Sequence, residues 1–406
     1  MIVGVYLVNV LPPHGGGYTF QYEVLNSLSR LKSKHHFVII GDLSHKEVEA
    51  LSSRNLKHAS LRSNLISRAL KRLISPPIKQ LRKFRRVQKR LQSVYANRME
   101  KIIDDHELEI MWFLTPGVVE IEMPYIITVW DLQHRGQPWF PEVSVHGEWE
   151  KREKIYGKAI RRASIVFVGT EVGKQEVVSF YQVPTERVKV IPQPTPDFAL
   201  KADRKEPERL LEKYGIKRRY ILYPAQFWPH KNHLVLLLSL DRLRREFDLS
   251  LDLVLVGSDQ GNLKHIRHMT EDLDLSNQVH FLGFVPQEDL EGLYQNAFTM
   301  VYPTFFGPDN LPPLEAFALG CPVIAGDVLG AREQLQDAAL LVNPKDEGEI
   351  ARAVKSLCDD PEIRETLIER GLHRARKWTG EDYVKSVLGV LDDFEKIRRC
   401  WGKRYP

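Results

Sequence analysis

Short apolar stretches alternate with helical segments along the 406-residue chain, and they fall into two series. The first series comprises residues 2–8, 37–40, 110–114, 125–129, 165–168 and 188–191. The second comprises residues 220–223, 251–256, 279–282, 299–302, 322–325 and 339–342. Continuously apolar strands separated by helices are typical of parallel sheets with helices on both faces. The sequence therefore predicts an α/β protein with two such sheets.

A proline-rich segment separates the two series. Pro192, Pro194 and Pro196 lie close together, and a charged stretch follows them, as is typical of a linker. We therefore expect one domain in residues 1–195 and another in residues 196–380. A last helix, at about residues 381–406, is expected to pack back on the first domain. Open α/β sheets bind ligands beyond the carboxyl ends of their strands, so a ligand site is predicted in the cleft between the domains.

Composition excludes several classes of protein. Hydrophobic residues make up 43% of the chain and charged residues 27%, as in ordinary globular proteins. The three cysteines are scattered and form no C-x-x-C pair, which argues against a disulfide scaffold or a structural zinc site and favours a reducing compartment. No run of 18 apolar residues occurs. The apolar amino terminus lacks a basic n-region and a small-residue cleavage site, so we interpret it as a buried strand.

Positive charge is concentrated in one window of the sequence. Residues 50–99 contain 14 Lys and Arg but no Asp or Glu, so the remainder is net negative although the whole chain carries +5. Apolar residues recur on one predicted helix face there, and Arg82, Lys83, Arg85 and Arg86 occupy the rest. Because acidic residues are absent, we favour a surface that binds anionic lipid. A solvated face over the core would give the same pattern. We expect a cytoplasmic protein, peripheral on the inner face of the cytoplasmic membrane under the lipid interpretation.

Three glycines follow the first predicted strand. Gly15, Gly16 and Gly17 precede a helical segment, where glycines let backbone amides approach a phosphate at a helix N-terminus. A tight turn that needs positive φ explains them equally well. The cluster is not G-x-G-x-x-G, which disfavours an NAD-dependent dehydrogenase.

Two charged residues of the second series stand at predicted helix starts. Lys231 follows a strand and a turn at Pro224, and a lysine beside free helix N–H groups suits an anionic diphosphate. A lone lysine is more often a solvated surface charge. Glu315 follows two prolines, and its carboxylate can accept two hydrogen bonds from a ribose. A glutamate that only complements the helix dipole, worth about 0.3–1 kcal/mol, would stand in the same place.

Five elements of the second half occur in an order found in a known family. They are Lys231-Asn232 and the segments 253–257, 279–285, 311–316 and 320–325. Together they resemble the retaining nucleotide-sugar glycosyltransferases of the GT-B fold, family 4. The resemblance covers most of the second half and, more loosely, the first. It implies two Rossmann-like domains that face each other across a cleft.

The resemblance also implies a role for each matching residue. Lys231 matches the lysine that binds the donor diphosphate, and Glu315 matches the last glutamate of the E-x7-E motif, which holds the ribose. Asp131 and His134 lie in a stretch similar to the family's His-Asp segment and join Lys231 as catalytic candidates. A structural role fits His134 equally well. The other residues expected to contact the donor are Gly15, Gly16, Gln226, Asn232, Gly257, Val285, Asp309, Asn310 and Leu311.

Three positions depart from the family pattern. Gln226 stands where an arginine is usual, Gly307 stands where the first glutamate of E-x7-E would fall, and Trp130 stands where the family often has histidine. These departures leave open how the phosphate charge is compensated and how the sugar hydroxyls are held. They also leave a catalytically degenerate homologue as an alternative.

The implied function is transfer of a hexose, taken as mannose-like, from a GDP- or UDP-linked donor to a saccharide or lipid-linked acceptor. Such a reaction belongs to cell-surface polysaccharide biosynthesis, and we expect it to need no cofactor and no metal. A nucleic-acid-binding protein that uses the basic window is the alternative from another class. Phe84 and Tyr95 are the only aromatic residues there, and no RRM, KH or helix-turn-helix pattern appears, so we expect no nucleic-acid partner.

Overall fold

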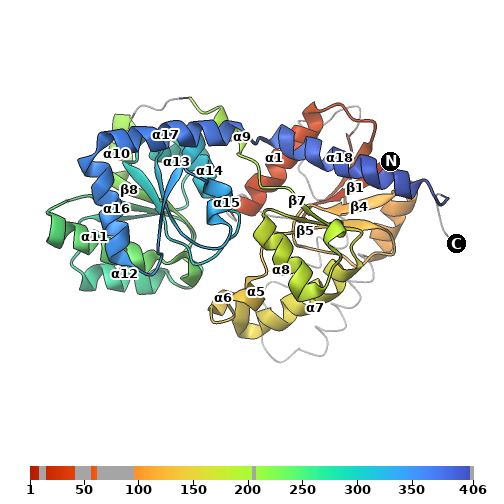
Figure 1. The fold of residues 1–406 in the computed structure, drawn as a ribbon, viewed down its shortest axis with the longest axis horizontal. Coiled ribbons are helices and arrows are strands. Elements are labelled where there is room, and N and C mark those ends of the chain that lie inside the picture. Colours follow the sequence, from red (N-terminus) through yellow and green to blue (C-terminus); the bar gives the residue numbers. More distant parts are fainter. Residues whose placement is uncertain (9–14, 42–55, 62–95, 204–206, 403–406) are drawn as a thin grey trace.

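The computed structural model describes residues 1–8, 15–41, 56–61, 96–203 and 207–402, which form two α/β domains side by side (Figure 1). Each domain is built on one parallel sheet flanked by helices. The α/β class and the two-sheet architecture predicted from the sequence are confirmed.

The first domain contains seven described strands. They are β1 (Ile2–Tyr6), β2 (His36–Ile40), β3 (Leu56–Ala59), β4 (Ile110–Phe113), β5 (Tyr125–Val129), β6 (Ile165–Val168) and β7 (Val188–Val190). They form a parallel sheet in the order β3-β2-β1-β4-β5-β6-β7. Six of the seven coincide with the predicted apolar stretches, because most of their residues are buried between the sheet and its helices.

Strand β3 is the element of this sheet that the apolar pattern does not predict. It lies inside the basic window, pairs with β2 alone and forms an edge of the sheet. Lys57 is exposed, and Ala59 is the only fully buried residue of the strand. An edge strand with one sparsely covered face needs no continuous apolar stretch, so the sequence pattern gives no signal.

Helices cover both faces of the first sheet. They are α1 (Gly16–Arg30), α5 (Gln133–Gly136), α6 (Pro141–Ser144), α7 (Glu148–Arg162) and α8 (Glu171–Tyr181), with 3-10 turns η3 (Val145–Gly147) and η4 (Thr185–Arg187). Alternate strand residues point to opposite faces. Val3 and Val5 therefore pack in the core under α1, whereas Val38 and Ile40 pack in the core under α7.

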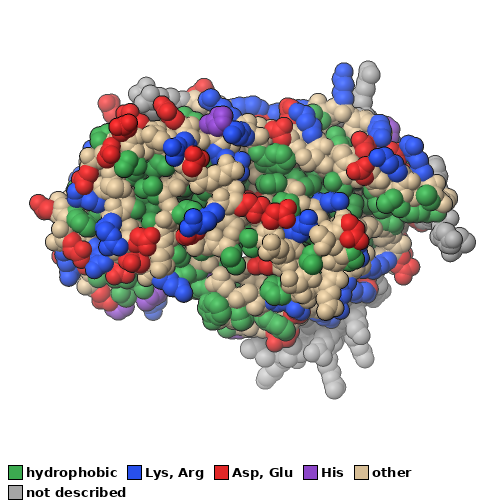
Figure 2. All heavy atoms as spheres, in the orientation of Figure 1, with side chains coloured by type: hydrophobic (Ala, Val, Ile, Leu, Met, Phe, Trp, Pro, Cys, Tyr) green, Lys and Arg blue, Asp and Glu red, His purple; other side chains and the backbone are tan. Residues whose placement is uncertain are grey.

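Most of the basic window lies outside the described residues, including Arg82, Lys83, Arg85 and Arg86. At its carboxyl end, residues 96–105 are helical and bury Met99 and Ile102 in the first domain. On the face shown in Figure 2, acidic and basic side chains of the described residues are interspersed over both domains. Within the described part of the chain, no helix combines the length and apolarity needed to cross a bilayer.

The second domain contains six strands. They are β8 (Tyr220–Pro224), β9 (Asp252–Val256), β10 (Val279–Gly283), β11 (Thr299–Tyr302), β12 (Val323–Gly326) and β13 (Ala339–Val342). They form a parallel sheet in the order β10-β9-β8-β11-β12-β13. Each coincides with a predicted apolar stretch to within one or two residues, and one continuous core packs around them.

Most helices of the second half cover this sheet, and the last one packs on the first domain. They are α9 (Asp197–Leu200), α10 (Pro207–Tyr214), α11 (His233–Phe247), α12 (Leu263–Asp272), α13 (Gln287–Asn296), α14 (Leu311–Ala318), α15 (Ala331–Leu335), α16 (Glu347–Asp359), α17 (Pro361–Arg376) and α18 (Gly380–Arg398), with the 3-10 turn η5 (Pro229–Lys231). Figure 1 shows α17 over the second domain and α18 beside α1 on the first.

The chain crosses between the domains twice, and the two crossings are bonded to each other. The Thr195 N–H donates to the Trp378 carbonyl at 3.0 Å, and the Trp378 indole donates to the Pro192 carbonyl at 2.8 Å. Thr379 then starts α18 with a capping box, in which its side chain and that of Asp382 bond each other's backbone N–H groups. This arrangement aims α18 back onto the first domain.

Helix α18 contributes apolar side chains to the core of the first domain. Tyr383, Val384, Val387 and Leu391 are buried there against β-strands and α1. The first domain therefore depends on residues from the end of the chain for part of its core.

This packing gives a test of stability. Replacing Leu391, which is fully buried, by alanine should lower the free energy of unfolding by about 2–5 kcal/mol, because the lost contacts leave a cavity. Ile397 lies on the same helix but is 59% exposed, so Ile397→Ala should change stability by no more than about 0.5 kcal/mol. Urea denaturation of both variants measures the difference, and equal effects would contradict the packing described.

Candidate active site

A cavity of about 370 Å³, the first cavity, lies between the two domains. The first domain lines it with Gly15, Gly16 and Gly17, which follow β1, and with Trp130 and Asp131, which follow β5. The second domain lines it with residues that follow β8 and β11. All of these segments leave the carboxyl ends of parallel strands, as predicted for a ligand site in an α/β protein.

A second cavity, of about 380 Å³, adjoins the first. The two share Gly15, Gly16, Gln226 and Leu311 in their linings. The second cavity extends along the second domain, past the ends of β9 and β10, where Gly257, Val285 and Glu315 line it. Together the cavities form one elongated cleft with room for a ligand of several linked groups.

The first-domain side of the cleft is a helix N-terminus. Helix α1 begins at Gly16, and Gly15 caps it with φ of 75° and without a side-chain cap. No acidic residue lies in its first turn. Backbone N–H groups and the positive end of the helix dipole therefore face the cleft, where they suit an anion. The positive φ confirms that Gly15 serves a tight turn, and phosphate binding at this turn stays a prediction.

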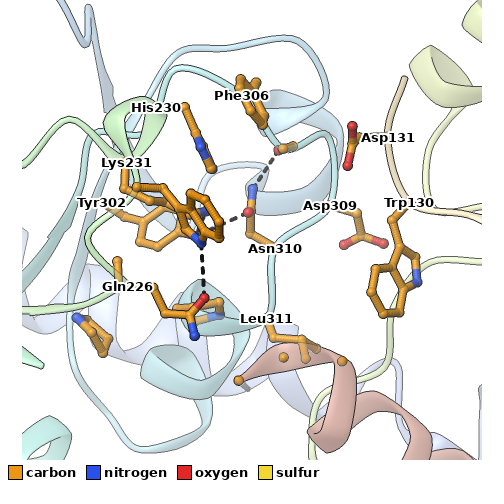
Figure 3. Close-up of a pocket in the computed structure, with 18 of the residues that line it drawn as sticks. Trp130, Asp131, Gln226, His230, Lys231, Tyr302, Phe306, Asp309, Asn310 and Leu311 are labelled. Carbon is orange, nitrogen blue, oxygen red and sulfur yellow. Dashed lines mark hydrogen bonds between the residues drawn. The ribbon is translucent and has the colours of Figure 1, made fainter. Parts of the chain in front are cut away.

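Lys231 lies on the opposite side, at the end of the 3-10 turn that precedes α11. Its ammonium donates to the Tyr302 hydroxyl at 2.8 Å, and its carbonyl accepts from the Tyr223 hydroxyl at 2.5 Å. The Tyr302 hydroxyl in turn donates to Asn310 Oδ1 at 3.1 Å (Figure 3). Among the described residues that line the two cavities, Lys231 is the only lysine or arginine.

Gln226 supplies no charge at the position where the family usually has arginine. Its side-chain amide donates to Ser258 Oγ at 3.2 Å, and its oxygen accepts from the Trp228 indole at 3.1 Å. The positive charge of the cleft therefore rests on Lys231 and the start of α1.

Glu315 is held in the second cavity by α14. Its carboxylate accepts a hydrogen bond from the Tyr294 hydroxyl at 2.8 Å, and the residue is 8% exposed. Burial raises the pKa of Glu315 to about 7, although the Tyr294 hydrogen bond opposes the shift. The group therefore ionises near neutral pH. Glu315 is the fifth residue of α14, whose first turn contains no acidic residue, so a contact with the helix dipole does not account for its position.

Close packing explains why a glycine, Gly257, directly follows β9. A Cβ at this position would lie 2.2 Å from the Ala225 carbonyl oxygen. The two chain segments that leave β8 and β9 can approach each other only because residue 257 has no side chain.

The segment 307–311 forms the floor of the first cavity. Asp309 is buried, and its two carboxylate oxygens accept from the Gln193 N–H and the Gln334 side chain, both at 2.6 Å. Burial raises the pKa of Asp309 to about 7, against the lowering effect of the Gln193 hydrogen bond. Because protein donors occupy both oxygens, the side chain fixes the loop, and Asn310 and Leu311 present their own atoms to the cavity.

Gly307 has a backbone conformation that excludes the glutamate of the E-x7-E motif. Its φ is 121°, and an added Cβ would lie 2.5 Å from the Asn310 side chain. The Asn310 amide donates to the Gly307 carbonyl at 2.5 Å and closes the turn. The absence of a glutamate at this position is therefore built into the local backbone.

Two predicted residues do not reach the cleft. His134 is fully buried, with Nε2 2.8 Å from Glu153 and 3.3 Å from the Tyr181 hydroxyl, and burial lowers its pKa. Asn232 has φ of 59° and donates to the carbonyls of Pro303 and Pro344. Neither lines the two cavities. His134 is bonded inside the first domain, and Asn232 joins neighbouring segments of the second domain.

Asp131 does line the first cavity. Its side chain is 30% exposed, lies 3.5 Å from Arg152 and accepts from the Gln133 N–H at 3.0 Å. It is the first-domain carboxylate that faces the ligand space (Figure 3).

The sequence analysis missed His230, Phe306 and Tyr302, which also line the first cavity. His230 directly precedes Lys231, which the sequence analysis had recognised. Its place in the site could therefore have been predicted from its position in the sequence. Glu142, which contacts His230 from the first domain, has no such signal because the two residues are far apart in the chain.

Within the described residues, one group could ligate a metal ion, and it lies outside the cleft. His35, Asp392 and Glu395 place ligand atoms within 4.8 Å of one another. Lys34 already lies 2.9 Å from each of the two carboxylates, and the amino terminus lies 3.1 Å from His35. These cations compensate the negative charge of the group.

Comparison with known proteins finds a family match in the second half of the chain. Residues 207–374 match the family model described as glycosyl transferases group 1. Over this domain the chain is similar to the group 1 glycosyltransferases. Its two parallel sheets facing across a cleft constitute the GT-B fold.

The individual relatives are less than 30% identical to this chain in sequence. The chain is 27% identical to O-antigen chain mannosyltransferase B of Escherichia coli over 239 residues, which is 59% of this chain and 63% of that protein. It is 29% identical to O-antigen chain mannosyltransferase RfbU of Salmonella typhimurium over 212 residues, or 50% and 55% of the two chains. The chain thus spans little more than half the length of these relatives. Anabaena HepE in complex with UDP superposes with a TM-score of 0.67 at 15% identity, covering 97% of this chain and 99% of HepE.

Proposed function

We propose that this chain is a group 1 glycosyltransferase and a retaining enzyme of family 4. It moves a hexose, taken as mannose, from a nucleoside diphosphate sugar to a saccharide or lipid-linked acceptor in cell-surface polysaccharide biosynthesis. The observation that carries the proposal is the first cavity, which has the N-terminus of α1 on one side and Lys231 on the other. The mannosyltransferase names of the two bacterial relatives and the UDP bound by HepE support it.

The donor would lie along the cleft. Its diphosphate fits between the amides at Gly15 and Gly16 and the Lys231 ammonium, because both groups offer hydrogen-bond donors to an anion. Its nucleoside fits the second cavity, where the Glu315 carboxylate can accept hydrogen bonds from the ribose hydroxyls. Its hexose then lies in the first cavity, beside Asn310 and Asp131.

Charge stabilisation accounts for the chemistry. The bond between the anomeric carbon and the diphosphate oxygen breaks, and its electron pair goes to that oxygen. Lys231 and the α1 amides stabilise the added negative charge in a cleft that excludes much of the water. The acceptor hydroxyl attacks the anomeric carbon from the same face, and its proton passes to the departing diphosphate. Asp131 is placed to orient sugar or acceptor hydroxyls. This scheme requires neither a metal ion nor a cofactor.

The proposal is tested by offering GDP- and UDP-linked hexoses with saccharide acceptors and reading the product by NMR. One nucleotide sugar should support transfer, and the new glycosidic bond should keep the donor's anomeric configuration. A product of inverted configuration would contradict the retaining mechanism. Binding of a nucleotide sugar without any transfer would instead show the catalytically degenerate homologue.

Lys231→Ala should weaken donor binding about 30- to 150-fold and leave the fold intact. The reason is that a charge-assisted contact to the diphosphate contributes about 2–3 kcal/mol, and no other lysine or arginine among the described lining residues replaces it. Calorimetry with the nucleotide sugar measures the change. Lys264→Ala, an exposed lysine of α12 outside the cavities, is the control and should bind as the parent does. Unchanged affinity in Lys231→Ala would remove Lys231 from the donor site.

Glu315 should make donor affinity depend on pH. Because its pKa is about 7, the carboxylate that accepts ribose hydroxyls is mostly protonated at pH 6 and mostly ionised at pH 8. Affinity for a nucleotide sugar should therefore rise up to about tenfold between these values. Glu315→Gln should bind more weakly, with a higher KM and a smaller effect on kcat, and should lose this part of the pH dependence. An identical pH profile in the variant would contradict the assignment.

We further propose that residues 50–99 attach the protein to an anionic membrane surface near its acceptor. Each basic residue close to such a surface contributes about 1 kcal/mol, and salt screens the attraction over about 10 Å at 0.1 M. Replacing Arg82, Lys83, Arg85 and Arg86 by glutamine should abolish sedimentation with acidic vesicles and spare transfer to a soluble acceptor analogue. Sedimentation equal to that of the parent would show that this face is only solvated.

A further inference from the structure

The first cavity contains a histidine whose position depends on both domains. His230, in η5 of the second domain, lines this cavity next to Lys231. Its side chain contacts Glu142, in α6 of the first domain. Glu142 Oε1 accepts from both the backbone N–H of His230, at 2.9 Å, and the ring Nδ1. One carboxylate oxygen thus fixes the residue at two points.

Aromatic side chains hold the same ring from its faces and edges. The Phe306 ring stacks on His230 with centroids 3.9 Å apart and planes 11° apart. Phe140, next to α6, lies edge-on to His230 at 6.3 Å and also contacts the rings of Phe305 and Phe306. The Gln137 amide, from the same first-domain segment, donates to the Phe305 carbonyl at 3.0 Å. The imidazole is therefore clamped between the domains and has little rotational freedom.

The contacts also fix which ring nitrogen carries the proton. Hydrogen bonds from His230 keep Glu142 ionised, since they outweigh the opposing effect of burial and hold its pKa below the usual range. Burial lowers the pKa of His230 to about 4, so the ring is neutral at pH 7. A carboxylate only accepts hydrogen bonds, which places the proton of the neutral ring on Nδ1. Nε2 is left as an acceptor, and no described residue donates to it.

The location of the ring restricts what can donate to Nε2. In the proposed donor complex, the phosphate oxygens carry no proton and accept hydrogen bonds from Lys231. They therefore cannot donate to His230 Nε2. A sugar presents O–H groups, and the transferred hexose is directly bonded to the diphosphate. Figure 3 shows His230 beside Phe306, between Lys231 and Asp131. The ring therefore lies next to the place proposed for the diphosphate. Gly307, which also lines this cavity, has no side chain that could accept a hydrogen bond from the sugar.

We propose that His230 Nε2 accepts a hydrogen bond from one hydroxyl of the transferred sugar, and that Glu142 is the positioning residue that orients it across the cleft. This inference rests on the proposed function. It makes His230 a residue that determines which hexose the enzyme selects, because a buried acceptor left without its hydroxyl disfavours the wrong sugar. The sugar site is complete only when the two domains are in the arrangement observed here.

Two substitutions test the roles of the two ring nitrogens of His230 separately. The amide of asparagine can occupy the place of Nδ1, so His230→Asn keeps the contact with Glu142 and removes the acceptor at Nε2. The amide of glutamine reaches the place of Nε2, so His230→Gln keeps an acceptor there and loses the contact with Glu142. The probes are the nucleotide sugar selected by the donor panel, GDP-mannose being the first, and its analogues that each lack one hexose hydroxyl.

In the parent, removal of one particular hydroxyl should lower kcat/KM at least tenfold. His230→Asn should lose a similar factor with the full donor and lose nothing further with that same analogue. His230→Gln should recover part of the loss. Glu142→Ala should discriminate less between the full donor and the analogue. Each variant should bind the free nucleoside diphosphate as the parent does, which also reports that the site is folded.

Two results would overturn the proposal. If every analogue loses the same factor in His230→Asn as in the parent, His230 does not contact the transferred sugar. If the analogues discriminate fully in the variant and the KM for the acceptor rises instead, His230 contacts the acceptor. Failure of the parent itself to bind a nucleoside diphosphate or to transfer a sugar would refute the proposed function, a result distinguishable from both.

Discussion

The cleft depends on a buried carboxylate that ties the segments around it together. Asp309 accepts one hydrogen bond from Gln193, in the crossing between the domains, and another from Gln334 of α15. The fit is close, because a Cβ at Gly169 of the first domain would lie 2.2 Å from an Asp309 oxygen. Leaving either buried donor unpaired would cost about 1–3 kcal/mol. The loop 307–311 therefore has one position relative to both domains, and the cavity floor is fixed with it.

The candidate anion site is divided between the two domains, and each domain supplies half of it. The first domain offers the backbone amides at the start of α1, and the second offers Lys231, which Tyr302 and Asn310 orient. Neither half neutralises a diphosphate by itself. His230 is divided between the domains in the same way, because it belongs to the second domain and Glu142 of the first domain orients it. The proposed donor site therefore depends on the arrangement of the two domains.

Local signals explain how much of the fold could be predicted. Most residues of the other twelve strands are apolar and buried, so these strands were found from the sequence, whereas β3 was missed because only Leu56 and Ala59 of its four residues are apolar. In the site, Lys231 and Glu315 stand in segments with recognisable order, and both line the cleft. Their proposed roles remain predictions.

The remaining features of the site are not local in sequence. The contact between Glu142 and His230 joins residues 88 positions apart, and no periodicity reports such a pair. The buried environment of His134 depends on Glu153 and Tyr181, which come from two other helices. The reason for glycine at 307, a φ of 121° beside Asn310, is also visible only in the folded loop.

The most direct test of the central claim compares nucleoside diphosphates with monophosphates. Calorimetric titration of UDP and UMP, and of GDP and GMP, into the full chain reports whether the cleft is built around a diphosphate. The account predicts one site per chain, a clear preference for one base, and a diphosphate affinity at least tenfold above that of the matching monophosphate, because the second phosphate reaches Lys231. Equal affinities for mono- and diphosphate, or no binding of either, would contradict it.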